Sequence, residues 1–299
     1  MKKLIALLLA AMMILSLAAC GGSGAASTGS TEAAGSTAST EPTGAAEAAE
    51  PAAPSISTVT AGKLTVATSP DFAPYEFYAV KDGTPTLAGF DVALAQYIAD
   101  YLGLELEMVP IDFDGVLMEL QTKNVDLGMA GLSPDPERES IMDFSDIYYM
   151  GGQSFVTVKG NEDKFPTLAD TNKAEYQIGA QTGSIQVDLA EENSPDADII
   201  QLAKVTDIIA ELLAGKLDGA YIETAVAENY AKNYPELAIV LDVPYDVEGS
   251  AVGVSKGNAE LLDAVNAAIA QALSDGSMDQ FIAEANELST GEIIEGLIG

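Results

Sequence analysis

The chain has 299 residues, of which 46 are acidic and 13 are basic, and its formal net charge is −33. This acidity argues against nucleic acid as a partner, because phosphates are bound by basic surfaces. The sequence has no histidine and a single cysteine, which excludes Ser–His and Cys–His catalysis, an intramolecular disulfide and a thiolate metal site.

The N-terminus has the pattern of an export signal. Two lysines precede an apolar run at 4–17, which is too short for a spanning helix and ends in small residues. The motif at 17–21, Leu-Ala-Ala-Cys-Gly, resembles the lipobox of bacterial lipoproteins, which implies cleavage after residue 19 and acyl chains on Cys20. An ordinary signal peptide with an incidental cysteine is the alternative. Residues 21–57 lack aromatic side chains, and their small and polar composition predicts a disordered tether.

The first half of the remaining chain alternates between strand and helix patterns. Strands are predicted at 63–68, 75–78, 104–110 and 125–130, and helices at 91–102 and 114–123. This order predicts a mainly parallel sheet. Ligands of such sheets bind beyond the carboxyl ends of the strands, which directs attention to residues 69–76, 111–114 and 131–138.

Arg138 is the only arginine in the chain, and the other basic side chains are lysines. A guanidinium binds a carboxylate through two parallel hydrogen bonds, which lysine cannot do. The alternative is an exposed ion pair. Asp135 and Pro136 predict the start of a short helix, with Arg138 in its first turn. The helix dipole disfavours a cation there, which favours a functional reason for Arg138.

Residues 89–103 (GFDVALAQYIADYLG) and 112–149, which include SPDPERESIMDFSDIYY, resemble the family 3 extracellular solute-binding proteins. These are the amino-acid receptors of bacterial ABC importers. The resemblance covers about residues 60–290. It implies an α/β, two-lobed periplasmic-binding-protein fold of type II (Venus-flytrap), in which each lobe is a mainly parallel sheet flanked by helices. Lobe I is expected at 58–150 and 249–299, and lobe II at 151–248.

The second half shows the same alternation. Strands are predicted at 176–180, 219–222 and 250–254, and helices at 185–192, 206–214, 224–234, 259–274 and 278–288. Gly151 and Gly152 fit either a bulge or a hinge between lobes, and the resemblance implies the hinge. Residues 241–248 are interpreted as a connection between lobes. A short internal echo repeats the order helix, short turn, strand: Glu119-Leu120 stands six residues before Val125-Asp126, and Glu211-Leu212 stands six residues before Leu217-Asp218. Arg138 comes after the first of these strands and Glu223 after the second.

The resemblance also implies roles for individual residues. Arg138 binds the α-carboxylate of the ligand, and Glu223, at a position where the family usually has Asp, accepts its ammonium group. Ser133, the Gly131 backbone and the N–H groups of the loop assist them; the loop residues are Thr182, Gly183 and Ser184.

Four further residues are assigned to the ligand's side chain. Phe72 stacks on the ligand and Phe113 forms a wall of the pocket, although taken alone both are typical core residues. Ser69 replaces an Asp found in some receptors for basic amino acids, which weakens the case for a basic ligand. Glu76 or Asp114 would restore that charge, the alternative for both being solvated surface acids.

We therefore expect a monomeric, extracytoplasmic binding protein for a free, polar amino acid, with a lipid anchor on Cys20 and ABC permease subunits as partners. Neither a cofactor nor a metal is expected, and no catalytic residue is assigned. Two alternatives remain. The fold also hosts cyclohexadienyl and arogenate dehydratases, in which a cleft carboxylate acts as the acid, and it serves as a sensory module.

Overall fold

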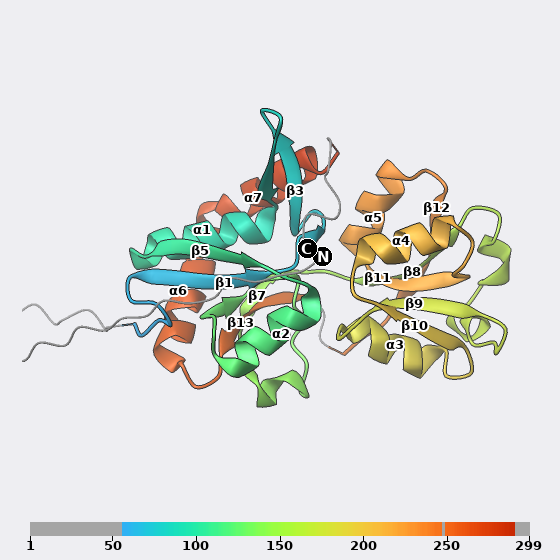
Figure 1. The fold of residues 1–299 in the computed structure, drawn as a ribbon, viewed down its shortest axis with the longest axis horizontal. Coiled ribbons are helices and arrows are strands. Elements are labelled where there is room, and N and C mark those ends of the chain that lie inside the picture. The colour runs from blue at the N-terminus through green and yellow to red at the C-terminus, as the bar shows by residue number, and fades with distance from the viewer. Residues whose placement is uncertain (1–55, 247–248, 291–299) are drawn as a thin grey trace, which may run out of the picture. The chain divides into compact units, whose positions relative to one another are not determined.

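A computed structural model describes residues 56–246 and 249–290 as two five-stranded sheets and one three-stranded sheet with helices packed against them (Figure 1). The first sheet has the order β5-β1-β6-β13-β7. β1 pairs in parallel with β5 and β6, whereas β13 pairs antiparallel with β6 and β7. The strands are β1 (Lys63–Thr68), β5 (Glu105–Pro110), β6 (Leu127–Gly128), β7 (Met142–Tyr149) and β13 (Ser250–Ser255).

Helices cover both faces of the first sheet, as two neighbouring residues of β1 show. Successive residues of a strand point to opposite faces. Val66 of β1 belongs to a cluster with side chains of α1 (Phe90–Leu102), α6 (Ala259–Asp275) and α7 (Ser277–Leu288). Its neighbour Ala67 packs instead with residues of α2 (Phe113–Thr122). α2 therefore lies on the opposite face from α1, and its first residue, Phe113, lies just beyond the carboxyl end of β5.

The second sheet has the order β10-β9-β11-β8-β12. β9 pairs in parallel with β10 and β11, and β8 pairs antiparallel with β11 and β12. The helix α3 (Ile185–Asn193) packs on one face, and α4 (Val205–Leu213) and α5 (Thr224–Asn233) pack on the other. The strands are β8 (Gln153–Val158), β9 (Gln177–Gln181), β10 (Asp198–Leu202), β11 (Gly219–Glu223) and β12 (Leu237–Val243).

A small antiparallel sheet connects β1 with α1. It consists of β2 (Asp71–Phe72), β3 (Glu76–Lys81) and β4 (Thr84–Ala88). The turn between β3 and β4 is formed by Asp82 and Gly83, with φ of 52° and 76°. Left-handed backbone at both central positions suits Asp-Gly and matches the twist of a hairpin. This small sheet fixes the segment that follows β1.

The internal echo in the sequence corresponds to a repeated structural detail. Asp126 precedes β6, and its N–H donates to Thr65 O (2.9 Å) while its Oδ2 accepts from Thr65 N (2.9 Å). Asp218 precedes β11 and makes the same pair of bonds to Gln177, at 2.8 Å and 3.0 Å. Each aspartate thus ties the start of a central strand to its parallel neighbour, β1 or β9. The two five-stranded sheets share one design.

Most predicted helices and strands are present within one or two residues, but three expectations differ. The sheets are mixed rather than mainly parallel, because β7, β8, β12 and β13 run antiparallel to their neighbours. Residues 241–243 belong to β12, so the connection between the two sheets begins only after Val243. The turn containing Arg138 is a short 3₁₀ helix, Arg138–Ser140, in which Arg138 N donates to Asp135 O (3.0 Å).

The export signal, Cys20 and nearly all of the tether lie outside the described residues. Within the described ranges, no helix combines the length and the apolarity that crossing a membrane requires.

Candidate ligand-binding site

Arg138 is buried between parts of the chain that belong to different sheets. The residue lies in the segment that follows β6 and is 8% exposed. Nη1 donates to Ser133 O (3.4 Å) and Nη2 donates to Gly183 O, on the loop after β9 (3.0 Å). The guanidinium carbon lies 5.8 Å from the centre of the Phe113 ring. Burial lowers the pKa of Arg138, although the Asp135 and Asp188 carboxylates oppose this shift.

No carboxylate of the described residues lies within 4.0 Å of the Arg138 guanidinium nitrogens. Its two hydrogen bonds to neutral carbonyl oxygens use only part of its five donors. A buried cation whose partners are neutral is suited to receive a carboxylate from a ligand, because an unpaired charge in a low-dielectric site gains most from a counter-charge.

The loop after β9 offers the carbonyl oxygen of Gly183 to Arg138, and two of its three N–H groups are already hydrogen-bonded within the protein. Thr182 N donates to Leu202 O (2.9 Å), and Ser184 N donates to Gln181 O (3.1 Å). The sequence predicted free N–H groups at 182–184, and this differs for two of the three. The Ser184 bond closes a turn in which the left-handed φ of Gly183 (77°) folds the chain back before α3, and the Thr182 bond ties the loop to the end of β10. Gly183 N–H has no hydrogen-bond partner among the described residues, so it can donate to a ligand.

A second network fixes the backbone at Gly131. Its N–H donates to Asp91 Oδ2 (3.0 Å), and the other Asp91 oxygen accepts from Tyr148 OH (2.7 Å). A Cβ at position 131 would lie 2.7 Å from Phe72 Cε1, so only glycine allows this approach. Asp91 is fully buried, and burial raises its pKa to about 6. This aspartate at the start of α1 therefore holds the Gly131–Ser133 turn in place.

Glu223 stands at the junction of β11 and α5. Its Oε2 accepts from Val226 N (2.9 Å), which caps α5, and its Oε1 accepts from Tyr75 OH (3.1 Å). Ser250 Oγ in turn donates to Tyr75 OH (3.3 Å). Tyr75 follows β2 and Glu223 ends β11, so this hydrogen bond joins the two halves of the structure. Glu223 is 3% exposed.

Gly151 and Gly152 lie where the chain passes from β7 of the first sheet to β8 of the second. A Cβ at Gly151 would lie 2.9 Å from Glu223 Oε1 and 3.1 Å from Tyr75 OH. Gly151 O accepts from Tyr245 OH (3.2 Å), and Tyr245 belongs to the return connection after β12. The absence of a side chain at 151 is therefore required by the close passage of the chain beside Glu223.

Glu76 is the most unusual buried acid. It is 0% exposed, and neither of its carboxylate oxygens has a hydrogen-bond partner of good geometry among the described residues. Burial, together with the Asp91 and Asp71 carboxylates, raises its pKa well above the ordinary value, while the nearby Ser69 amide opposes the shift. Among the described residues, no group of three or more side chains is arranged to hold a metal ion.

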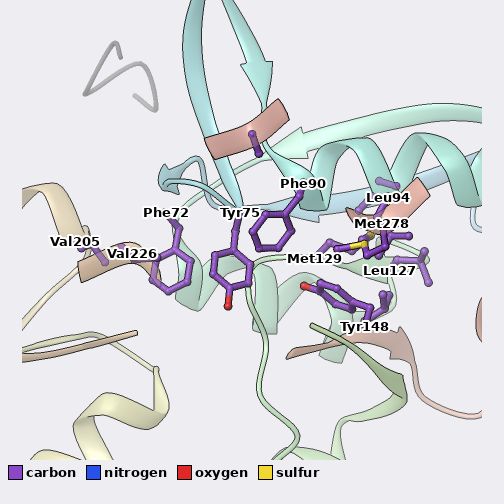
Figure 2. Packing of buried hydrophobic residues seen from close by; sticks show 14 of the residues in the cluster. Phe72, Tyr75, Phe90, Leu94, Leu127, Met129, Tyr148, Val205, Val226 and Met278 are labelled. Carbon is purple, nitrogen blue, oxygen red and sulfur yellow. The ribbon is translucent and has the colours of Figure 1, made fainter. Parts of the chain in front are cut away.

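The remaining predicted residues have diverse surroundings. Phe72 and Phe113 are both 7% exposed. Figure 2 shows the Phe72 ring beside Tyr75 in a cluster that also contains Val205 and Val226 of the second sheet's helices. Ser69 is buried and its Oγ donates to Asp71 Oδ1 (3.0 Å). Asp114 is exposed, which agrees with the alternative of a solvated acid.

Two cavities adjoin the segment from Ser133 to Arg138. One, of about 310 Å³, is lined by Leu117, Arg138, Ile141, Gly183, Ser184 and Val187, among others. The other, of about 410 Å³, is lined by Ser133, Pro134, Ile185, Asp188, Leu189 and Tyr245, among others. Both cavities have walls from each sheet, so this segment faces space that a small molecule can reach.

Sequence reasoning missed Asp71, Tyr75 and the role of Asp91. Asp71 Oδ2 accepts from Val205 N at 2.6 Å, and Tyr75 binds Glu223, so both act on distant parts of the chain. Only Asp91 carried a local signal, because it stands in the first turn of α1 directly after Gly89 and Phe90.

From the raised pKa values of the buried acids we expect the free energy of unfolding to fall as the pH rises through the acid range to neutrality. Burial raises the pKa of Glu223 from 4.5 to about 7, with the bonds from Val226 N and Tyr75 opposing the shift. Between these two pH values the native state keeps a proton on Glu223 that the unfolded chain releases. The contribution of this proton to the free energy of unfolding is therefore complete below about pH 4.5 and is lost as the pH rises toward 7. Thermal melts should therefore give a lower Tm at about pH 7.5 than at about pH 5.

Glu223→Gln isolates this group from the general repulsion in an acidic chain. Glutamine does not titrate, so the pH dependence of the free energy of unfolding should become shallower, by at most about 1.4 kcal/mol per pH unit. An unchanged slope in this variant would contradict the raised pKa.

Known proteins resemble this chain in sequence and in fold. The model of the bacterial extracellular solute-binding proteins, family 3, matches residues 64–285. The arginine-binding extracellular protein ArtP of Bacillus subtilis (strain 168) is 30% identical over 284 residues, which cover 94% of this chain and 96% of ArtP. A solved structure of the amino acid ABC transporter substrate-binding protein AbpA from Streptococcus pneumoniae, bound to L-arginine, is similar with a TM-score of 0.74. It is 34% identical and covers 77% of this chain and 97% of that chain.

An enzyme also appears among the relatives. Cyclohexadienyl dehydratase from Pseudomonas aeruginosa is 28% identical over 180 residues, which cover 60% of this chain and 66% of the enzyme. This likeness is weaker than that to ArtP in both identity and coverage.

Proposed function

This chain belongs to the bacterial extracellular solute-binding proteins, family 3. We propose that the amino acid it binds carries a cationic side chain. The protein has the two-lobed type II periplasmic-binding-protein fold, and it binds an amino acid outside the cytoplasm for delivery to an ABC importer. Arginine is the first candidate for the ligand, since it is the ligand named for both ArtP and the AbpA structure.

The observation that supports a cationic ligand is the buried, unpartnered carboxylate of Glu76. An isolated carboxylate in a protein interior is strongly destabilised, so it either takes up a proton or meets a cation. Asp71 and Asp91 lie close enough to raise its pKa, and both are themselves buried. A guanidinium brings several donors and a positive charge to such a place, which an uncharged polar side chain does not.

The charges on the two sides of the site match a cationic amino acid. Arg138 receives the α-carboxylate, assisted by Ser133 and by the Gly183 N–H of the loop at 182–184. Glu223 receives the α-ammonium group, and Glu76 receives the cationic end of the side chain. Phe72 and Phe113 lie against the aliphatic part. One cation and two anions of the protein then meet one anion and two cations of the ligand.

The division into lobes follows the two five-stranded sheets. The first lobe comprises 58–150 and 249–299, and the second comprises 151–248. The chain leaves the first lobe after β7 and returns to it at β13. Gly151 and Gly152, which follow β7, form a hinge between the lobes. Ligand contacts to both lobes would favour the form in which they enclose it.

The N-terminal features complete the proposal. Cys20 carries the lipid anchor after cleavage of 1–19, and 21–57 tether a monomeric binding domain to the outer face of the membrane. More than one acyl chain is needed for stable anchoring. Metabolic labelling with a radioactive fatty acid should label the wild type and not Cys20→Ala.

The proposal assigns no catalytic step to the chain. A dehydratase on this fold would convert prephenate, and Glu76 or Glu223 would be the acid available to it. Incubation with prephenate followed by ultraviolet detection of phenylpyruvate separates the two functions, since turnover would overturn the assignment as a binding protein only.

Isothermal titration with a panel of amino acids tests the ligand class. Arginine should bind, and citrulline, its uncharged isostere, should bind about 10- to 100-fold more weakly, because hydrogen bonds to a charged partner contribute about 1.5–3 kcal/mol. Lysine, ornithine, glutamine and cystine complete the panel. Citrulline or glutamine binding as tightly as arginine would contradict the proposal.

A further inference from the structure

Asp71 of the first lobe contacts several elements of the second lobe. Its Oδ2 accepts from Val205 N, the first residue of α4, at 2.6 Å, and lies 3.5 Å from Gln181 Nε2 at the end of β9. Its backbone oxygen accepts from Tyr230 OH of α5 (3.1 Å). One residue of β2 therefore contacts three elements of the second lobe.

The first lobe holds Asp71 in position for these contacts. Ser69 Oγ donates to Asp71 Oδ1 (3.0 Å), which orients the carboxylate, and the residue is 7% exposed. The next side chain, Phe72, enters the hydrophobic cluster that contains Val205 and Val226 of the second lobe (Figure 2). Polar and apolar contacts thus cross between the lobes at the same point.

These bonds differ in kind from a longer, partly exposed ion pair between the same lobes. Lys204 Nζ lies 3.9 Å from Asp112 Oδ1, and their side chains are 21% and 38% exposed. An ion pair of that length and exposure contributes little. A buried carboxylate that accepts a short bond from the first amide of a nine-residue helix is charge-assisted and favoured by the helix dipole.

We propose that Asp71 is a positioning residue that latches the two lobes together and so raises the population of the enclosing form, whichever amino acid is bound. The inference rests on the two-lobed binding function proposed above, but not on the cationic ligand. Hydrogen bonds between lobes exist only while the lobes are together. Removing them lowers the fraction of binding-competent protein, and the apparent affinity falls in proportion to that fraction.

The experiment compares Asp71→Ala and Asp71→Asn with the wild type. Stopped-flow binding of arginine should show a dissociation rate about 10- to 100-fold higher in Asp71→Ala, with an association rate changed much less, because release of the ligand requires the latch to open. Asparagine keeps an oxygen that can accept from Val205 N without the charge, so Asp71→Asn should lie between the two. Asp112→Asn is the matched control and should stay within about twofold.

Small-angle X-ray scattering without amino acid tests the latch independently of the ligand. Asp71→Ala should have a larger radius of gyration than the wild type under the same conditions, and Asp112→Asn should not. Should Asp71→Ala fail to fold, Tyr230→Phe removes only the hydroxyl that binds Asp71 O, and a several-fold faster dissociation is expected. A folded Asp71→Ala with wild-type dissociation rate and scattering overturns the proposal. Failure of arginine to bind the wild type would instead count against the cationic ligand, and the scattering comparison would still stand.

Discussion

Replacing Arg138 with alanine is expected to weaken amino-acid binding by about 2–5 kcal/mol, which is a loss of affinity of about 30- to 5,000-fold. The carboxylate of the ligand would enter a site that is buried and otherwise uncompensated. Every α-amino acid has this carboxylate, so the loss should be similar for arginine and for citrulline.

The fold should survive this substitution. Among the described residues, the Arg138 side chain is hydrogen-bonded only to the carbonyl oxygens of Ser133 and Gly183, and the residue lies in a three-residue 3₁₀ helix rather than in the core of either sheet. Removing a buried charge also removes its desolvation cost, which offsets the lost hydrogen bonds. Circular dichroism and the Tm without ligand should therefore stay close to those of the wild type.

Arg138→Lys is the matched variant, because it keeps the charge and loses the planar fork. A single ammonium cannot form two parallel bonds to a carboxylate, so affinity should fall less than in the alanine variant but remain well below wild type. Calorimetry that gives near-wild-type affinity for Arg138→Ala would refute the assignment of this residue as the carboxylate anchor.

The sequence was sufficient to predict the limits of the helices α1 to α7 closely, because local residues determine where a helix begins and ends, whereas several strands, among them β8, β10 and β12, were not predicted. Gly103 and Gly276 end helices in left-handed conformations, and Asp82-Gly83 makes a hairpin turn. Arg138 could be singled out by its uniqueness and its position after a strand. Glu223 could be singled out because a charge follows a buried strand that ends in Ile222.

What the sequence did not predict depends on pairing at long range. The partner of Asp71, Val205, is 134 residues away, and the partner of Tyr75, Glu223, is 148 residues away. No periodicity signals such a bond. The antiparallel direction of β13 is likewise invisible locally, because an apolar strand has the same pattern in either direction. The mixed sheets and the connections between lobes follow from topology.

The repeated design gives each lobe one charged residue at or beyond the end of a central strand. Asp126 and Asp218 tie equivalent central strands to their parallel neighbours, Arg138 follows β6 in the chain, and Glu223 is the last residue of β11. The carboxyl ends of parallel strands are where such sheets place ligands. A lobe that offers a cation and a lobe that offers an anion can then bind the two ends of one zwitterion, without any further requirement on the ligand's side chain.

Glu76→Gln should change which side chain is bound rather than whether an amino acid is bound. The variant keeps the size of the residue and removes the anion that is proposed to meet the guanidinium. Arginine should lose about 1.5–3 kcal/mol of binding free energy, whereas citrulline should be little affected. The preference for arginine over citrulline would then largely disappear.

Glu223→Gln is the matched control for this specificity change. Glu223 is proposed to meet the ammonium group, which arginine and citrulline share, so its loss should weaken both ligands by a similar factor. The difference between the two variants therefore separates the side-chain partner from the main-chain partner. If Glu76→Gln keeps the wild-type preference for arginine, the buried acid instead shares a proton with Asp91 as part of the fold, and the cation must be recognised elsewhere in the site.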